Sequence, residues 1–149
     1  MKVGVYNIIN DPLPKLNLIK KIDVNEDDFE YDEDIVKMMN KHLKMDKLDS
    51  EYIYALSLTY SLIPRGIIQV SSGDNKGSKN NLRGLAIGLL LTGAEQFMCF
   101  HNHPGGSKKI SQSDILSTEK YDELGDTIGI DFIRHIMITK NYYCNCEEE

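Results

Sequence analysis

The sequence has few cysteines and no long hydrophobic run, and each shortage excludes a class of protein. Its 149 residues include three cysteines, an odd number that does not indicate a disulfide framework. The longest apolar run, Leu85 to Thr92, is far shorter than the ~20 residues that a membrane-spanning helix needs. The apolar start is soon broken by Asn10-Asp11-Pro12, so it is not typical of a signal peptide. We therefore expect a cytoplasmic protein with no membrane segment.

Positive charge is also scarce. The chain has 17 lysine and arginine residues against 23 aspartate and glutamate residues, and the net charge of −6 argues against a general nucleic-acid surface. Acidic residues gather in residues 23–34 and in the tail, Glu147-Glu148-Glu149, which we interpret as a solvated loop and a frayed end. The length of 149 residues and the hydrophobic content of 41% indicate one domain with a single core.

The periodicity of the apolar residues predicts the order of helices and strands. Before residue 47 it predicts two short strands over 3–9 and 16–24 and a helix over 32–44. From residue 51 onward it predicts, in chain order, strands over 52–58 and 63–71, a loop over 72–81, a helix from Leu82 to Gly93, a strand over 95–100, a helix from Ser111 to about Gly125, and strands over 130–139 and 142–146. The β-β-α-β-α-β-β order of this second part predicts an α/β domain in which helices flank a mixed sheet.

The three cysteines are expected to have separate structural roles. Cys99 lies in a predicted buried strand, where a cysteine behaves as a small core residue. Cys144 and Cys146 alternate near the C-terminus. As a pair they are too few for a structural zinc site, so we interpret them as part of a tail strand.

Two histidines end one of the predicted buried strands. His101 and His103 follow the apolar run 97–100, and residues two apart in a strand point to the same side. Both imidazoles can therefore converge on one point, and a metal ion there would offset the desolvation cost of burying them. Pro104-Gly105-Gly106 then turns the backbone sharply, which keeps both rings at the exposed end of the strand.

A carboxylate follows at the start of the next predicted helix. With Ser111 as the N-cap, Asp114 occupies the third helical position, where its charge also suits the helix dipole. After two histidines, Asp114 completes the ligand set of a catalytic zinc ion with an open fourth position. Such a site also needs a carboxylate that relays a proton, and Glu51 and Glu95 are the candidates. Glu95 lies near the opposite end of the histidine strand, so geometry favours Glu51, which begins a different strand that could lie beside it.

These residues resemble the signature of a known family. Glu51, His101-x-His103-Pro104 and Ser111-x-x-Asp114 together resemble the Glu…His-x-His-Pro…Ser-x-x-Asp signature of the JAMM metalloproteases, the JAB/MPN+ superfamily. The closer similarity is to the bacterial RadC-like branch, whose His-Asn-His-Pro-Ser-Gly motif is similar to His101-Asn102-His103-Pro104-Gly105-Gly106. We therefore expect a RadC-like JAB/MPN domain over residues 48–149. Residues 1–47 then look like an N-terminal extension, with short strands and a helix, packed on that domain.

The resemblance implies a fold, a metal and a reaction. The fold would be a cytidine-deaminase-like α/β sheet, and a zinc ion would be bound by His101, His103 and Asp114. Glu51 would be the general acid/base, and Ser111 would help to hold the carbonyl oxygen as it becomes an oxyanion. The implied reaction is the hydrolysis of a peptide or isopeptide bond in a protein substrate, often next to a ubiquitin-like partner.

The chain departs from the RadC-like pattern at three positions. Gly105 stands where the branch has serine, Ile110 replaces a proline, and Arg134 replaces the aspartate that usually precedes the late histidine. None of these changes removes a ligand or the base. We expect Gly105 and Ile110 to affect the loop that carries Ser111, and Arg134 to change a charge outside the ligand set.

Two alternative functions stay open. The first is a non-catalytic JAB-like binding module, although a module of that kind would not need the Glu51 carboxylate. The second is a role in DNA repair or processing. It would depend on basic residues that could gather near the site: Lys76, Lys79, Arg83, Lys108 and Lys109.

Overall fold

A mixed seven-stranded sheet runs through the middle of the molecule, in the strand order β2-β1-β4-β3-β5-β6-β7. The computed structural model describes residues 1–71 and 81–147. The strands are β1 (Lys2–Asn10), β2 (Pro14–Asp23), β3 (Ile53–Leu58), β4 (Pro64–Ser71), β5 (Gln96–Asn102), β6 (Asp131–Thr139) and β7 (Tyr142–Asn145). The helices are the 3-10 helix η1 (Glu26–Phe29) and the α-helices α1 (Asp32–Leu43), α2 (Leu82–Leu91) and α3 (Gln112–Ile128). The predicted α/β class with a mixed sheet and flanking helices is confirmed.

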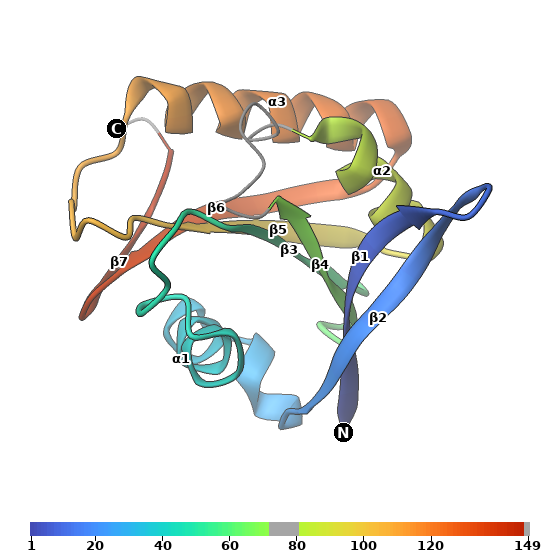
Figure 1. Cartoon of the computed structure of the whole chain (residues 1–149), viewed down its shortest axis with the longest axis horizontal. Coiled ribbons are helices and arrows are strands. Elements are labelled where there is room, and N and C mark those ends of the chain that lie inside the picture. The colour runs from blue at the N-terminus through green and yellow to red at the C-terminus, as the bar shows by residue number, and fades with distance from the viewer. Residues whose placement is uncertain (72–80, 148–149) are drawn as a thin grey trace.

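Helices cover the two faces of the sheet unequally. Figure 1 shows α2 and α3 on one face and α1 on the other. Because side chains alternate along a strand, β5 supplies both cores. Phe97 and Cys99 pack in the core beneath α2 and α3, whereas Met98 and Phe100 pack in the core above α1. The same alternation directs the next odd-numbered residue, His101, toward α3.

The position of β5 explains why its sequence is almost wholly apolar. It lies between β3, to which it is antiparallel, and β6, to which it is parallel. Both of its faces are covered, and residues 97–102 are all buried. The strand runs two residues beyond its predicted end at 100, because His101 and Asn102 still pair with Met137 and Ile138 of β6. His101 is therefore part of the sheet because it pairs with β6, and not because its side chain is hydrophobic.

Residues 1–47 contribute to the same sheet. β1 and β2 form an antiparallel hairpin, and β1 pairs in parallel with β4 through Val5 and Tyr6. The acidic stretch 23–34, which we expected to be a solvated loop, instead contains η1 and the first turn of α1. Phe29 is only 1% exposed, and its burial provides the apolar anchor that the charge pattern did not reveal.

Two glycines mark close packing of helices on the sheet. A Cβ atom at Gly88 of α2 would lie 2.7 Å from the side chain of Ile68 in β4. The predicted end of α3 at Gly125 is wrong. A Cβ there would lie 2.5 Å from the carbonyl oxygen of Ile130, so Gly125 is a packing residue, and α3 continues to Ile128. The helix ends at Gly129, whose φ of 75° is left-handed.

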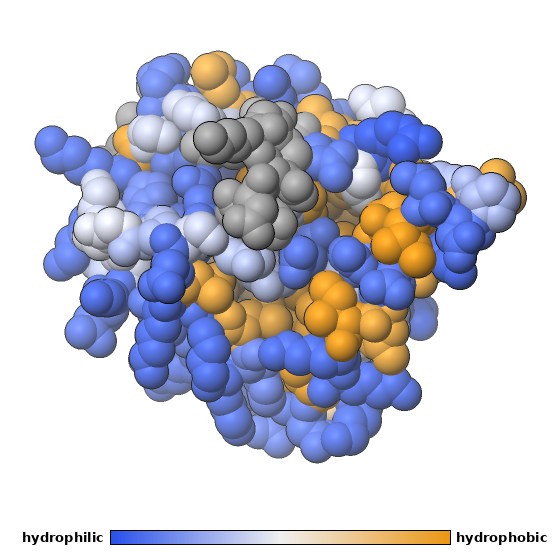
Figure 2. All heavy atoms as spheres, in the orientation of Figure 1, coloured by the Kyte–Doolittle hydropathy of each residue, from blue (hydrophilic) through white to orange (hydrophobic). Residues whose placement is uncertain are grey.

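The surface carries exposed apolar side chains on several different elements. They include Leu13 in the β1–β2 turn, Tyr60 and Ile63 between β3 and β4, and Leu90 and Leu91 on α2. Figure 2 shows one face as largely hydrophilic with separate hydrophobic patches. Within residues 1–71 and 81–147, no helix has the length and apolarity needed to cross a membrane. Most of the predicted 72–81 loop lies outside the described residues, and its last residue, Asn81, caps α2.

Candidate metal centre

The end of β5 and the turn after it place the two histidine rings. His101 is paired on one side with Ile53 and on the other with Met137. His103 lies just past the strand, where its N–H donates to the carbonyl oxygen of Ile138 at 3.0 Å and its own carbonyl accepts from the Thr139 hydroxyl at 2.9 Å. Both imidazoles therefore project from a backbone that is fixed by β6.

The first turn of α3 places the carboxylate. Ser111 and Asp114 form a reciprocal capping box: the Asp114 N–H donates to the Ser111 hydroxyl at 3.0 Å, and the Ser111 N–H donates to Asp114 Oδ2 at 3.0 Å. Asp114 is thus a helix-cap residue, as its position predicts, and it also faces the histidines. One carboxylate serves both the helix and the site.

The three side chains bring their ligand atoms to one point. His101 Nε2 lies 3.1 Å from His103 Nε2 and 3.2 Å from Asp114 Oδ1, and His103 Nε2 lies 3.1 Å from Asp114 Oδ2. Zinc–nitrogen bonds of about 2.0–2.1 Å in a tetrahedral arrangement separate neighbouring ligands by about 3.3 Å. The observed separations fit a single ion of this size after a shift of a few tenths of an ångström.

The three side chains differ in their exposure to solvent. The side chains of His101 and Asp114 are 2% and 3% exposed, whereas that of His103 is 14% exposed. Solvent therefore reaches the group from the His103 side. Catalytic zinc sites have this form, with three protein ligands and one accessible position.

The tautomer of His103 follows from its neighbour. Nδ1 lies 2.9 Å from the carbonyl oxygen of Ser107, which can only accept, so this nitrogen carries the proton. Nε2 is then the nitrogen with the lone pair, and it is the one that faces Asp114 and His101. The Pro104–Ser107 turn thus orients the ring for metal binding in the way that outer-shell carbonyls do.

The tautomer of His101 follows from a longer chain of hydrogen bonds. The Thr118 hydroxyl donates to the Asp114 carbonyl oxygen at 3.0 Å, and it lies 2.8 Å from His135 Nδ1. It must therefore accept from that nitrogen, which leaves His135 Nε2 to accept from His101 Nδ1 at 2.7 Å. In its neutral form His101 thus presents a bare Nε2 to the site. His135 and Thr118 were not assigned a role from the sequence, because only the pairing of β5 with β6 brings them behind His101.

The charge state of Asp114 also suits a cation. Burial by itself would raise the pKa of Asp114, but the hydrogen bond and charge that His101 supplies when its Nε2 is protonated, together with the N–H and hydroxyl of Ser111, bring that pKa well below its ordinary value. The carboxylate is therefore ionised at neutral pH, which is the form that binds a metal.

Glu51 lies just before β3, beside the histidines. Ile53 is paired with His101, so extending this register by two residues places Glu51 across from His103, on the same face of the sheet.

A clamp formed by Asn102 holds the Glu51 segment. The side-chain oxygen of Asn102 accepts from the Tyr52 N–H at 2.7 Å, and its amide donates to the Ser50 carbonyl oxygen at 3.0 Å. Asn102 is 1% exposed. The residue between the two histidines, which points to the opposite face of β5, thus fixes the backbone on both sides of Glu51. The alternation of side chains along a strand predicts that Asn102 points away from the two histidines. Its contacts with Ser50 and Tyr52 could not be predicted, because they depend on how β3 and β5 are aligned.

Two other residues considered from the sequence lie away from the ligand group. Glu95 precedes the far end of β5, where its carboxylate accepts from the Tyr60 N–H at 3.0 Å. Arg134 points toward α1 and pairs with Asp32, with nitrogen–oxygen distances of 2.8 and 3.0 Å. Arg134 therefore ties β6 to α1 and does not place a charge among the ligands.

The basic residues proposed for a DNA role are only partly described. Lys76 and Lys79 lie outside the described residues. Lys108 stacks over the Tyr142 ring at 5.1 Å from its centroid. This contact is between the loop after the histidines and β7, and it gives one of the basic side chains an intramolecular partner.

Comparison with known proteins relates the chain to one family. The sequence profile of the RadC-like JAB domain matches residues 29–149. A UPF0758 protein of Listeria monocytogenes is 42% identical over 60 residues, which are 40% of this chain and 27% of that protein. A UPF0758 protein of Clostridium acetobutylicum is 32% identical over 111 residues, which are 72% of this chain and 48% of that protein. A UPF0758 protein of Finegoldia magna is 34% identical over 95 residues, which are 62% of this chain and 42% of that protein. The chain therefore spans less than half the length of each of these relatives.

Proposed function

The chain belongs to the RadC-like JAB domain family, and from this premise we propose that it is a zinc-dependent hydrolase of peptide or isopeptide bonds. The observation that carries the proposal is the convergence of three side chains: His101 Nε2 lies 3.1 Å from His103 Nε2, and the two nitrogens lie 3.2 and 3.1 Å from the Oδ1 and Oδ2 atoms of the Asp114 carboxylate. The hydrogen-bond partners of both rings leave those nitrogens free to bind. Two neutral imidazoles and one carboxylate also leave a divalent ion with a net positive charge, which hydrolysis requires.

Each residue of the site has a distinct task. A bound zinc ion would supply acidity to a water molecule and polarise the carbonyl group of the substrate. Glu51 accepts the proton of the attacking water and delivers it to the leaving nitrogen, as a carboxylate beside the open position can do. Asn102 positions Glu51 through its two backbone contacts. Because both contacts are to the backbone, they orient the carboxylate without occupying its oxygens.

Ser111 has a part in both structure and chemistry. Its hydroxyl oxygen accepts from the Asp114 N–H, and its proton can rotate between the Asp114 carboxylate and a bound substrate. We assign that proton to the carbonyl oxygen of the substrate as negative charge develops there. A peptide or protein would be the substrate, and a ubiquitin-like protein is the partner implied by the superfamily. The three free thiols are in keeping with action in the reducing cytoplasm.

Metal analysis of the native protein is the first test. We expect about one zinc ion per chain, because His101, His103 and Asp114 form the ligand set of one catalytic zinc site. His103→Ala or Asp114→Asn should lose it, with far-ultraviolet circular dichroism used to show that the variants stay folded. A folded native protein that takes up no zinc from buffered solution would refute the proposal.

Turnover is the second test, with a matched pair of glutamates. Glu51→Gln should retain zinc and lose hydrolysis of a panel of peptide- and isopeptide-linked substrates by at least about 100-fold, because a proton relay contributes about 10²–10⁴-fold. Glu95→Gln, at the other end of β5, should retain both zinc and hydrolysis. Loss of activity in Glu95→Gln but not in Glu51→Gln would overturn the assignment of the base. Zinc binding without hydrolysis of any substrate would favour a binding module instead.

A further inference from the structure

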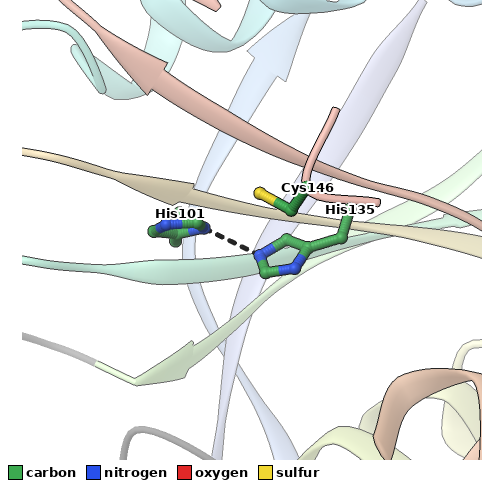
Figure 3. Close-up of side chains that lie close together, drawn as sticks. All are labelled: His101, His135 and Cys146. Atoms are coloured by element: carbon green, nitrogen blue, oxygen red, sulfur yellow. Dashed lines mark hydrogen bonds between the residues drawn. The ribbon is translucent and has the colours of Figure 1, made fainter. Parts of the chain in front are cut away.

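A second group of metal-binding atoms lies directly behind the first. One ligand atom each of His101, His135 and Cys146 lies within 4.8 Å of the other two, and all three residues are buried. The two rings face each other through His101 Nδ1 and His135 Nε2, which are 2.7 Å apart. Figure 3 shows the Cys146 sulfur pointing toward His101, beside the hydrogen bond that joins the two rings. The two groups share His101, which faces one with Nε2 and the other with Nδ1.

The fold holds the cysteine firmly in this place. The Cys146 N–H donates to the His135 carbonyl oxygen at 2.7 Å, just beyond the last pair of β7 with β6. The Cys146 carbonyl oxygen also lies 3.4 Å from the Thr118 hydroxyl oxygen. Residue 146 is 0% exposed, so the chain after β7 turns inward against α3. The expectation that Cys146 belongs to a tail strand did not foresee this contact.

We propose that His101, His135 and Cys146 form a second, buried site for copper(I), and that copper bound there competes with the hydrolytic metal for His101. The binding half of this proposal is independent of the hydrolase assignment. The competition half rests on it.

Charge and ligand type favour a soft monovalent ion. Two imidazoles and one thiolate suit copper(I), which binds sulfur well and is stable with two or three ligands. Copper(I) and a thiolate cancel each other's charge, whereas a zinc ion would leave one uncompensated positive charge in a buried setting. Within the described part of the chain, no carboxylate joins this group to supply a fourth ligand, which zinc would need.

The distances permit one ion to reach all three atoms. Metal–sulfur and metal–nitrogen bonds of about 2.3 Å and 2.0 Å in a trigonal arrangement place sulfur about 3.7 Å from each nitrogen and the two nitrogens about 3.5 Å apart. The ligand atoms, which lie within 4.8 Å of one another, would therefore have to move by up to about 1 Å. The proton shared by His101 Nδ1 and His135 Nε2, which are 2.7 Å apart, occupies the space that the ion would take.

The protons balance without a further reactant. His135 already presents the lone pair of Nε2, because its Nδ1 proton is donated to Thr118. His101 must move its proton from Nδ1 to Nε2, and the Cys146 thiol releases its proton to solvent as the copper–sulfur bond forms. Burial raises the pKa of the Cys146 thiol, so the group is neutral until an ion arrives.

Competition follows from the same proton movement. A neutral imidazole has one bare nitrogen at a time. When Nδ1 of His101 binds copper, its Nε2 carries the proton and is lost to the first site, which keeps only His103 and Asp114. Thr118, whose hydroxyl contacts His135, and Glu147, which follows Cys146 in the chain, line a hollow at the surface with Glu119 and Asp122.

An anaerobic copper(I) titration of the full chain tests the binding half, with bicinchoninate as the competing chromophoric ligand. We expect one tight equivalent for the native protein and binding weaker by about 100-fold or more for Cys146→Ser, because the thiolate is lost. Cys144→Ser, a half-buried cysteine outside the group, is the matched control and should bind like the native protein. Equal affinity in the native protein and Cys146→Ser would overturn the site.

X-ray absorption at the copper edge gives a readout that does not depend on a variant. One sulfur and two nitrogen neighbours are expected, and a shell without sulfur, or with sulfur alone, would refute the ligand set. His103→Ala, which removes the first site, should still bind copper(I). If this variant instead binds zinc in a Cys146-dependent manner, the copper(I) assignment is wrong.

Zinc-loaded native protein tests the competition half. One zinc ion should be released for each copper(I) bound, and Cys146→Ser should release none under the same conditions. Copper binding with zinc fully retained would overturn the competition and leave the first site intact. Failure of the native protein to take up zinc would instead count against the hydrolase proposal alone, since the copper titration needs no zinc.

Discussion

Replacing Asn102 with alanine should lower stability and activity while leaving zinc in place. The side chain makes hydrogen bonds of 2.7 Å to the Tyr52 N–H and 3.0 Å to the Ser50 carbonyl oxygen. Alanine leaves both backbone groups without that partner, and each unsatisfied buried group costs about 1–3 kcal/mol. Residues 50–52 are only half-buried, so water can reach them in part. We therefore expect the lower part of the range, about 2–3 kcal/mol in all.

Three measurements check this expectation. Urea unfolding should give the loss of free energy directly, and the melting temperature should fall by about 4–12 °C for a chain of this length. Turnover should fall by about 10- to 100-fold, because the Glu51 backbone is no longer fixed and displacements of about 1 Å have effects of that size. Zinc content should stay near one per chain, since no ligand is touched.

Asn17→Ala is the matched control for Asn102→Ala. Asn17 donates one side-chain hydrogen bond of 2.9 Å to Asn7 across the β1–β2 hairpin, in a half-buried position. Its loss should cost less than about 1 kcal/mol and leave turnover unchanged. The reasoning fails if the two variants are equally stable, or if Asn102→Ala loses its zinc together with its activity.

Three further variants separate the roles of the surrounding residues. His135→Ala should weaken zinc binding about 10- to 100-fold in a competition titration with a chromophoric chelator, because the metal-binding imidazole loses the acceptor of its Nδ1 proton; an unchanged affinity would contradict the tautomer chain. In the presence of a chelator, Ser111→Ala should lower the free energy of unfolding by about 1 kcal/mol, because the N–H of Asp114 loses the hydroxyl that caps it. Ser111→Thr should restore that stability. Equal stability of the two variants would argue against the cap. Arg134→Ala should cost less than about 1 kcal/mol in physiological salt and leave zinc affinity unchanged, because its ion pair with Asp32 is about one-third exposed; a loss of zinc would place Arg134 in the site after all.

The sequence was a good guide to elements whose signals are local. Alternation of apolar residues located the strands, and helical spacing with acids in the first turn located α1 to within one residue of its observed end. Such patterns work because a strand or helix must present its apolar face to the core whatever lies across from it. The limits of α3 were misjudged, because a glycine within a helix looks like a stop unless its packing partner, here Ile130, is known.

Some residues of the candidate site could be predicted from local sequence patterns, and others could not. His101, His103 and the Ser111–Asp114 cap could be proposed from spacing, since two strand residues and one helix turn fix where each side chain points. The roles of His135, Thr118 and Asn102 could not, because they depend on which strand lies beside β5 and in what register. Cys146 was assigned to the tail strand for the same reason.

The sequence by itself determined the kinds of ligand, their spacing and the apolar strand that carries them. Those properties are local, and they follow from the geometry of one strand and one helix turn. Only the tertiary structure decided which nitrogen of each histidine faces the candidate metal site, and that a cysteine forty-five residues after His101 comes close to the same ring. Such contacts join strands that are distant in the chain, and their energy depends on register and burial, which no local pattern encodes.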